Sequence, residues 1–340
     1  MTTNENKASL LRKICDAPEL YCVDVPLPDN PLKNLNCYIL RSGGKLLVID
    51  TGFRIPETAE VLFAALAELD VSFQNTTLFL THLHSDHTGL ADHFAEKGCT
   101  IYMSAIDYDL FIASRKDKNH FLAYHKEGFP MDELLKQLEV NPAKVFAPST
   151  SFPAVTFADG FRFHIGDVEL EAIHTPGHSP GHCCLYIPEY EIMFLADHVL
   201  FDITPNITTW PGVQNSLQDY MDSLKKIEKY PMKLALPAHR GNEMDVYQRI
   251  SDIQIHHMRR LENTLSVVEE HPDSTAYEIA SYMTWSMRGK DWTEFPLHQK
   301  WFAVGETVAH LNWLRLSGRI EKHLDGEVSR YRKIPGAAPV

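Results

Sequence analysis

Apolar and polar positions between residues 37 and 239 follow patterns that predict a series of short strands. Residues 37–50 (CYILRSGGKLLVID) form two apolar runs on either side of Ser42-Gly43-Gly44, which is the pattern of a β-hairpin. The same pattern predicts hairpins with turns at Gly166-Asp167 and near Pro188-Glu189. Isolated apolar runs predict three further strands, at residues 76–82 (TTLFLTH), 100–104 (TIYMS) and 234–239 (LALPAH).

Segments with helical spacing lie between these strands. Residues 55–69 (IPETAEVLFAALAEL) and 90–98 (LADHFAEKG) predict two helices. Residues 104–160, which include YDLFIASR and MDELLKQL, predict a helical insertion between a strand and the next hairpin. Strands that alternate with helices in this way favour an α/β fold.

The pattern becomes helical from Val246 onwards. Three helical segments follow one another; the second opens with a Ser/Thr cap and the third ends at Gly318. Two short strand-like runs then surround Asp325-Gly326, and this order of elements is that of a winged helix. We therefore predict two domains, residues 1–245 and residues 246–340.

Apolar residues in the third helical segment fall on one stripe, which consists of Trp301, Phe302, Val304, Val308, Leu311 and Leu314. An exposed stripe of this kind would be a liability in a soluble protein. We expect its own domain, the N-terminal domain or a second copy of the chain to cover it. The C-terminal domain is thus interpreted as a packing or dimerisation module, with a homodimer as one expected assembly.

The charge of the chain argues against nucleic acid as a partner. The 340 residues carry a formal net charge of −13, whereas nucleic-acid-binding proteins usually present a basic surface. Residues 246–340 are neutral, with 12 Lys and Arg against 12 Asp and Glu, so the acidic excess lies in residues 1–245. A neutral domain attached to an acidic domain lacks the basic surface that binding to DNA requires.

Hydropathy and cysteine usage indicate the compartment. The first twenty residues contain no apolar segment of signal-peptide length, and no apolar run in the chain is long enough to span a membrane. Six cysteines without regular spacing are interpreted as reduced. The expected location is the cytoplasm, with no membrane partner.

Histidine and aspartate residues gather where the predicted strands end. THLHSDHTG follows one strand, Asp197 ends another, and His239 ends a third. His178 lies between proline- and glycine-containing turns in TPGHSPGH, which present its imidazole on a tight loop. Because rigid strand ends fix the side chains of the loops that follow, these positions are candidates for one site.

Imidazole nitrogen and carboxylate oxygen are ligands that zinc takes in proteins. Two histidines separated by one residue in an extended turn can face one ion, and the Asp-His pair that follows can turn toward a second. The predicted ligands therefore form two sets joined by a bridging carboxylate: His82, His84 and His178 for one ion, Asp86, His87 and His239 for the other, and Asp197 between them.

On these motifs, the sequence resembles the metallo-β-lactamase superfamily of hydrolases. THLHSDHTG, HTPGHSPGH, FLADHVL and LPAHRG are similar, in this order, to the four metal-binding motifs of that family, and the resemblance covers about residues 20–246. It implies a four-layer αββα sandwich with a two-metal site at one edge of the sheets. The C-terminal segment resembles a winged-helix-like domain that is attached to some of these hydrolases.

Two positions indicate the branch of the family. Asp197 stands where the zinc enzymes that hydrolyse penicillins commonly carry cysteine. His84 stands where the oxygen-reducing flavodiiron members commonly carry glutamate. The resemblance therefore favours the branch of glyoxalase II, lactonases and thioesterases.

The reaction expected of such a site is hydrolysis of an ester, thioester or lactone of a small molecule. Two divalent ions roughly 3.5–4 Å apart can hold a hydroxide between them that attacks a carbonyl carbon, so no serine or cysteine nucleophile is needed. Asp86 is expected to orient the hydroxide or to assist proton transfer. Zinc is the expected metal, and iron and manganese stay open because these ligands accept all three.

The sequence marks substrate-binding residues less clearly. The candidates are Phe121 and Tyr124 in the insertion, for which packing onto the sandwich is the alternative, and Asp202, Asn206 and Trp210 after the bridging aspartate. Two other functions stay open. One is a nuclease of the same superfamily, which the acidic charge disfavours; the other is a metal-containing regulatory protein that uses the winged-helix domain, which would predict damaged ligands.

Overall fold

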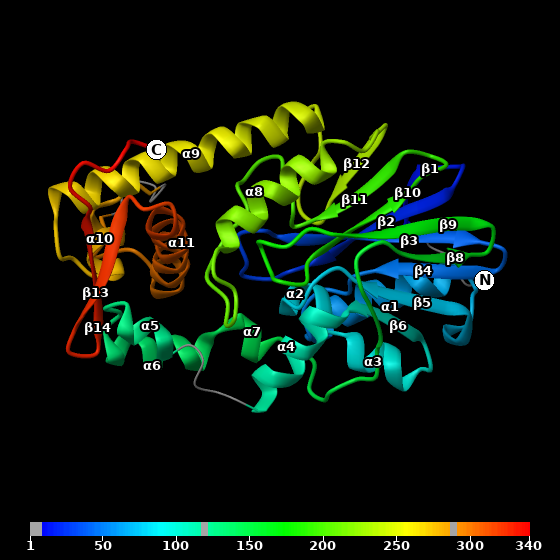
Figure 1. Cartoon of the computed structure of the whole chain (residues 1–340). Helices are drawn as coiled ribbons and strands as arrows, with labels where there is room; N and C mark the ends of the chain where they lie inside the picture. Colours follow the sequence, from blue (N-terminus) through cyan, green and yellow to red (C-terminus); the bar gives the residue numbers. More distant parts are fainter. Residues whose placement is uncertain (1–8, 117–121, 286–290) are drawn as a thin grey trace.

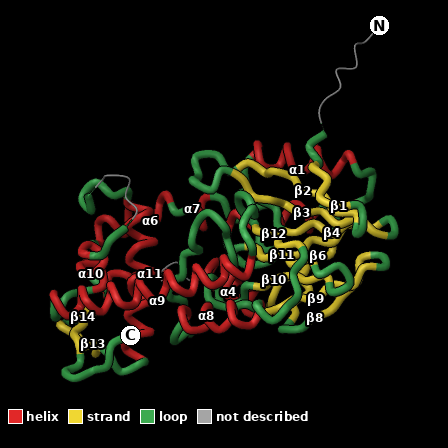
Figure 2. Tube along the Cα trace, turned by 90° about the horizontal axis from the view of Figure 1, so that it is seen from above, coloured by secondary structure: helices red, strands yellow, loops and turns green. Residues whose placement is uncertain are grey.

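Two β-sheets lie face to face as the inner layers of a sandwich, with helices on their outer sides (Figure 1). The structure is a computed structural model, and it describes residues 9–116, 122–285 and 291–340. The strands gather at one end of the molecule and the C-terminal helices at the other, which is clearest when the chain is seen from above (Figure 2).

The first sheet contains seven strands in sequence order. They are β1 (Arg12–Cys15), β2 (Glu19–Pro26), β3 (Asn34–Ser42), β4 (Lys45–Ile49), β5 (Thr76–Leu80), β6 (Thr100–Ser104) and β7 (Val155–Phe157). The pairs from β1 to β4 are antiparallel, and those from β4 to β7 are parallel. The predicted hairpin at Ser42-Gly43-Gly44 is confirmed as the connection between β3 and β4.

The second sheet contains five strands in the order β12, β11, β10, β9, β8. Their bounds are β8 (Phe161–Ile165), β9 (Val168–His174), β10 (Cys183–Ile187), β11 (Ile192–Ala196) and β12 (Leu234–Pro237). Both hairpins predicted here are confirmed, because β8 pairs with β9 and β10 pairs with β11 in antiparallel fashion. Strand β12 adds in parallel to β11 and forms one edge.

Alternation along the strands produces the four layers of the sandwich. In β5, Phe79 packs between the two sheets, whereas Leu78 and Leu80 point to the opposite face and pack under helices. The helices on that side are α1 (Pro56–Glu68), α3 (Ala91–Glu96) and α4 (Ala105–Lys116); η1 (Phe73–Asn75) precedes β5. Helix α8 (Ser216–Ile227) covers the outer face of the second sheet. The αββα sandwich that the sequence predicted is therefore present.

The insertion predicted at 104–160 is helical for most of its length but not to its end. It contains α4, α5 (Ala123–Lys126), α6 (Met131–Val140) and α7 (Pro142–Val145). Residues Val155–Phe157 instead form β7 at the edge of the first sheet. The prediction was wrong at this end because a strand of three residues is too short to show an alternating pattern.

The C-terminal segment has the predicted order of elements: α9 (Val246–Glu270), α10 (Ala276–Tyr282), α11 (Leu297–Leu316), β13 (Ile320–Asp325) and β14 (Val328–Lys333). Thr275 caps α10 through a capping box with Glu278. Of the predicted apolar stripe on α11, four members are buried and Trp301 is partly buried, but Phe302 is 45% exposed. Phe302 therefore lies outside the stripe.

One hydrophobic cluster joins the C-terminal helices to the sandwich. It includes Met193 and Leu195 of the second sheet, Ile250 near the start of α9, and Val304 of α11. The insertion contributes Phe129 and Leu134 to this cluster, and Tyr331 of β14 donates a hydrogen bond of 2.7 Å to Glu127 after α5. The C-terminal elements are thus packed onto the body of the protein rather than joined to it by a linker.

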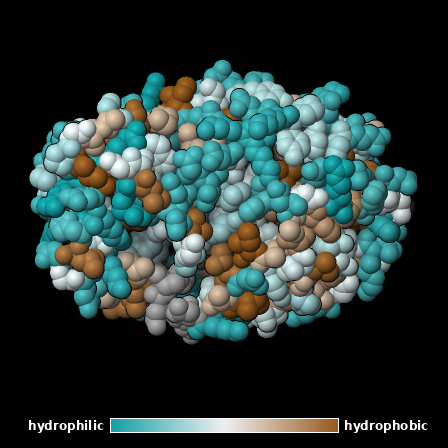
Figure 3. Space-filling view, in the orientation of Figure 1, coloured by the Kyte–Doolittle hydropathy of each residue, from teal (hydrophilic) through white to brown (hydrophobic). Residues whose placement is uncertain are grey.

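The surface seen in Figure 3 is largely hydrophilic, with hydrophobic side chains in scattered patches. Among the residues that the structure describes, no helix is both long enough and apolar enough to cross a membrane.

Candidate metal centre

Four loops that follow strands converge at one edge of the two sheets. The loop after β5 carries His82 and His84 and leads into α2 (Ser85–Thr88), which carries Asp86 and His87. The loop from β9 to β10 carries His178, while Asp197 and His239 follow β11 and β12. Because β11 and β12 run parallel, their carboxyl ends deliver these last two residues to the same edge.

Three imidazoles meet in the first of the two predicted sets. Nε2 of His82 lies 3.0 Å from Nδ1 of His84, and Nε2 of His178 lies 3.0 Å from that same atom. His82 is fully buried, and His178 is 7% exposed. The structure therefore brings the ring of His178 to two histidines that lie about 94 positions earlier in the chain.

The second set combines a carboxylate with two imidazoles. Oδ2 of Asp86 lies 3.8 Å from Nε2 of His87 and 3.5 Å from Nε2 of His239. Both histidines are fully buried. The predicted grouping of these three residues is also found in the structure.

Asp197 lies between the two sets and directs one carboxylate oxygen to each. Its Oδ1 is 3.3 Å from Nε2 of His239 and 3.6 Å from Nε2 of His87. Its Oδ2 is 3.5 Å from Nε2 of His178. This is the arrangement that a carboxylate bridging two cations would require.

Hydrogen bonds on the far side of the rings fix which nitrogen carries the proton. Nδ1 of His178 donates to the carbonyl oxygen of Asn206 at 2.9 Å, and Nδ1 of His239 donates to that of Asn34 at 2.8 Å. Nδ1 of His87 donates to Oδ2 of Asp50 at 2.8 Å. Carbonyl and carboxylate oxygens only accept, so in the neutral form of each ring the lone pair is on Nε2, which points into the site.

Several polar atoms at the centre are buried without a partner. Among the described residues, Nε2 of His87, Nε2 of His239 and Oδ1 of Asp197 accept no hydrogen bond. Burying such atoms unpaired is costly, and a cation at their meeting point would satisfy all three. The donor set of neutral imidazoles and carboxylates fits divalent metal ions such as zinc.

The electrostatics of the two sets differ. Burial and the neighbouring His178 lower the pKa of His84 to about 3, and burial with the adjacent imidazoles lowers the pKa of His82 strongly. In the second set, against the effect of burial, His87 and His239 lower the pKa of Asp86 to about 2. Against the effect of burial, nearby carboxylates raise the pKa of His87 strongly and also raise that of His239, so a cation in the second set would displace protons from these two rings.

Asp107 on α4 holds two of the ligand-bearing loops together, and it is not among the site residues predicted from the sequence. Its fully buried carboxylate accepts hydrogen bonds from the backbone N–H of Leu83 at 2.9 Å, the hydroxyl of Ser179 at 2.6 Å and the backbone N–H of Gly181 at 2.5 Å. Burial raises the pKa of Asp107 to about 6, against these three donors. A lone aspartate in a helical segment carries no sequence signal of this role.

The candidates for substrate contact lie in different surroundings. The indole ring of Trp210 stacks over His84 with ring centroids 5.8 Å apart, and its Nε1 donates to the carbonyl oxygen of His178 at 3.1 Å. Asp202 is exposed. Tyr124 is 8% exposed and stacks on Trp301 at 4.0 Å. Phe121 lies outside the described residues, and Asn206 is the residue whose carbonyl oxygen contacts His178.

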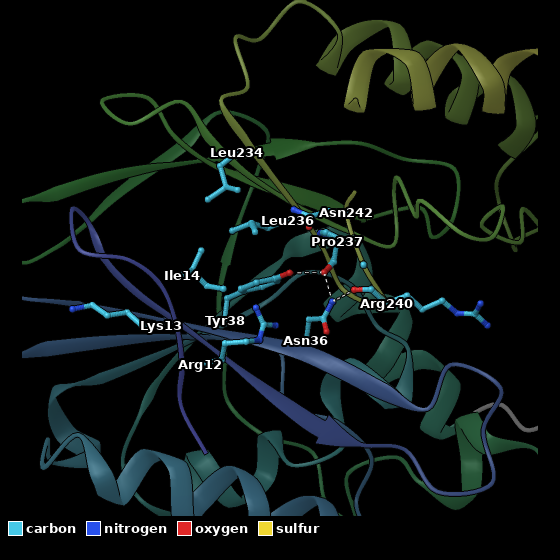
Figure 4. Close-up of a pocket in the computed structure, with 11 residues that line it drawn as sticks. Arg12, Lys13, Ile14, Asn36, Tyr38, Leu234, Leu236, Pro237, Arg240 and Asn242 are labelled. Carbon is cyan, nitrogen blue, oxygen red and sulfur yellow. Dashed lines mark hydrogen bonds between the residues drawn. The ribbon is translucent and has the colours of Figure 1, made fainter. Parts of the chain in front are cut away.

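An open cavity of about 440 Å³ lies beside the centre, between β1, β3 and β12 (Figure 4). Tyr38 and Asn36 close its inner end by donating hydrogen bonds to the carbonyl oxygen of Pro237. None of the seven predicted ligands lines this cavity. It is therefore separate from the position where the histidines and aspartates meet.

Comparison with known protein families gives two matches along the chain. A model described as the metallo-beta-lactamase superfamily matches residues 31–239, which contain all seven predicted ligands. A model described as the metallo-beta-lactamase-like C-terminal domain matches residues 261–334. The second match begins within α9.

Two solved structures are similar over nearly the whole chain. A metallo-β-lactamase family protein from Thermus thermophilus is 28% identical, with a TM-score of 0.77, and the match covers 93% of this chain and 98% of that one. A β-lactamase domain protein from Burkholderia ambifaria is 25% identical, with a TM-score of 0.81, and the match covers 98% and 97%.

Curated relatives with named activities are also similar to the chain. An atrochrysone carboxyl ACP thioesterase from Emericella nidulans is 27% identical over 72% of this chain and 63% of its own length. One from Aspergillus fumigatus is 30% identical over 70% of this chain and 64% of its own length. The chain thus spans less than two thirds of these relatives. A β-lactamase-like protein 2 homolog from Caenorhabditis elegans is 24% identical over 76% of this chain and 74% of its own length.

Proposed function

The chain belongs to the metallo-β-lactamase superfamily, and we propose that it is a two-metal hydrolase that cleaves a thioester, ester or lactone of a small molecule. The observation that carries the proposal is the position of Asp197, which directs one oxygen to each of two histidine-containing sets. A single metal would leave one of these sets without a cation.

In this proposal His82, His84 and His178 hold one ion, Asp86, His87 and His239 hold the other, and Asp197 contacts both. When bound, two divalent ions supply Lewis-acid chemistry, because they lower the pKa of water toward neutrality and polarise a carbonyl group. Zinc is the first choice for this donor set, with iron and manganese as alternatives.

The protein itself contributes orientation and charge. Asp86 is ionised at neutral pH, since its pKa is about 2, and its carboxylate can accept a hydrogen bond from the attacking water and hold it in line with the carbonyl carbon. We therefore assign Asp86 a catalytic role. The indole of Trp210 stacks over His84 and would form one wall of the site.

A thioester is the first substrate class to test. Two of the relatives similar to this chain are named atrochrysone carboxyl ACP thioesterases. The net charge of −13 disfavours a polyanionic substrate, so we propose a small acyl group rather than RNA or DNA. We also propose that the chain has two domains: a hydrolase domain, residues 1–245, and a winged-helix-like domain, residues 246–340. A homodimer is the assembly to be tested.

The experiment is a comparison of substrates with zinc-loaded protein. Acyl-CoA thioesters, acyl carrier protein thioesters, lactones, p-nitrophenyl esters and single-stranded RNA are offered at equal concentration, and Asp86→Ala serves as the control. We expect turnover of thioesters or oxygen esters that Asp86→Ala lowers by at least about a hundredfold. Turnover of RNA alone would replace this proposal with the nuclease function.

A further inference from the structure

The segment between β11 and α8 connects the candidate metal centre to the C-terminal helices. Arg249 of α9 fixes its first part, because Nε donates to the carbonyl oxygen of Leu200 at 2.6 Å and Nη2 donates to that of Ile203 at 2.8 Å. Helix α11 fixes the middle at Gly305, where an added Cβ would overlap Oγ1 of Thr208. The segment is therefore held by two helices of the C-terminal part.

Asn206 occupies the point where this segment contacts both sides. Its carbonyl oxygen accepts the hydrogen bond from Nδ1 of His178 at 2.9 Å. Its side-chain Nδ2 faces the other way and donates to the carbonyl oxygen of Phe302 at 3.3 Å and to Oε2 of Glu306 at 3.4 Å, both on α11. One residue thus joins a predicted metal ligand to a helix that lies about a hundred positions further along the chain.

Glu306 is itself held in place. Its Oε1 lies 3.4 Å from Nε of Arg260 on α9, and each of the two side chains is only 14% exposed. Arg260 in turn donates to the carbonyl oxygen of Thr284 at 2.7 Å and lies over the ring of Trp285 at 4.3 Å. An ion pair that is this well enclosed and further bonded keeps a defined geometry, because few other partners are within reach.

We propose that Asn206 and Glu306 are positioning residues through which the C-terminal helices hold His178 in its metal-binding orientation. The inference rests on the proposed metal centre, and it assigns the C-terminal elements a role in that centre. Neither side chain needs to touch the substrate. The contribution of Asn206 is to keep its own carbonyl oxygen in place, and that of Glu306 is to keep Asn206 in place.

The physical reason lies in the two nitrogens of His178. While Nδ1 donates to Asn206, the proton stays on Nδ1 and Nε2 faces Asp197 and the other imidazoles. If the segment shifts, that acceptor is lost, and the proton can move to Nε2, where it blocks metal binding. The loss of such an outer partner typically lowers metal affinity 10–100-fold.

The test compares Asn206→Ala and Glu306→Ala with a matched control in the full-length protein. Ile279→Val on α10 removes one buried methyl group from the same hydrophobic cluster and does not alter the segment, so it measures the effect of lower stability alone. Zinc affinity is measured for both positions by competition with a chromophoric chelator. The tautomer of His178 is read separately from a long-range ¹H–¹⁵N spectrum of the metal-free protein.

The proposal predicts that both alanine variants lose about tenfold in zinc affinity at the position of His82, His84 and His178. They keep the wild-type affinity at the other metal position. It also predicts that a smaller fraction of His178 carries its proton on Nδ1 in these two variants, and that Ile279→Val changes neither the affinity nor the tautomer. Glu306→Gln keeps an oxygen for Asn206, so its zinc affinity should fall less than about threefold.

Wild-type affinity and tautomer in both alanine variants would overturn the inference, as would an equal loss in Ile279→Val. These outcomes are distinct from a failure of the proposed function. If only the proposed hydrolase function fails, the wild-type protein will bind two zinc ions and the variants will change zinc affinity as described, but none of the substrates offered will be hydrolysed.

Discussion

Nδ1 of His87 lies 2.8 Å from Oδ2 of Asp50, at the end of a strand 37 residues earlier in the chain. The same carboxylate accepts hydrogen bonds from the backbone N–H of Thr81 at 2.9 Å and from its hydroxyl at 2.8 Å. Asp50 therefore fixes both the start of the histidine loop and the ring of His87. In this way the end of β4 determines where Nε2 of His87 points.

Replacing Asp50 with asparagine tests this relationship. An amide can turn its NH₂ group toward Nδ1 of His87, which would favour the tautomer with the proton on Nε2. We expect zinc affinity to fall 10–100-fold at the position of Asp86, His87 and His239. Chelator competition on the folded variant provides the measurement, and an unchanged affinity would show that Asp50 has only a structural role.

Asp197 and His198 are neighbours in sequence with different predicted effects. Only Asp197 faces both ligand sets, while the ring of His198 packs 5.1 Å from that of Tyr220. We expect Asp197→Ala to lower kcat by several orders of magnitude and His198→Ala to lower it much less. If steady-state kinetics gave equal losses in the two variants, the assignment of the bridging residue would be wrong.

The ligand set could be predicted from sequence because its residues occur in short motifs at the ends of apolar runs. His82 to His87 lie within one turn, and Asp197 and His239 each end a strand, so local pattern and residue chemistry are sufficient. The four layers also follow from alternation, as Phe79 and its neighbours in β5 illustrate.

Residues that act over long distances could not be predicted in this way. Asp107 and Glu306 are single carboxylates in helical segments, and their partners lie 24 to 100 positions away. Asp50 did carry a weak signal in the sequence, because it ends an apolar run just before Thr51-Gly52. Edge strand β7 and the exposure of Phe302 depend on tertiary contacts that no local pattern records.

The raised pKa of Asp107 gives a pH-dependent stability. Burial raises its folded-state pKa to about 6, above an unfolded value of about 3.9, so the native state binds this proton more tightly. The contribution of Asp107 to stability is therefore largest below about pH 4 and declines as the pH rises to about 6. Asp107→Asn does not titrate and lacks this decline.

Urea unfolding of wild type and Asp107→Asn at pH 4 and pH 7 measures the effect. The difference in unfolding free energy, wild type minus variant, is expected to be about 2 kcal/mol larger at pH 4, because groups common to both proteins cancel. Asp109→Asn, at an exposed position of the same helix, is the control and should show no such change. If the difference in unfolding free energy between wild type and Asp107→Asn did not depend on pH, the raised pKa assigned to Asp107 would be wrong.

Removal of the C-terminal elements should expose the cluster that joins them to the sandwich. A chain that ends at Asp245 loses the partners of Met193, Leu195 and α8, and it also loses Arg249 and Glu306. We expect this chain to aggregate or to lose activity, as judged by light scattering and by the thioester assay. A soluble, monomeric and fully active product would show that the C-terminal elements are independent of the site.

Titration of metal-free protein with zinc, while thioester hydrolysis and bound zinc are recorded together, tests the two-metal account most directly. We predict that binding saturates at two equivalents, that full activity requires both, and that His178→Ala binds one equivalent tightly and remains nearly inactive. Full activity in metal-free protein, or at a single equivalent of zinc, would contradict the account.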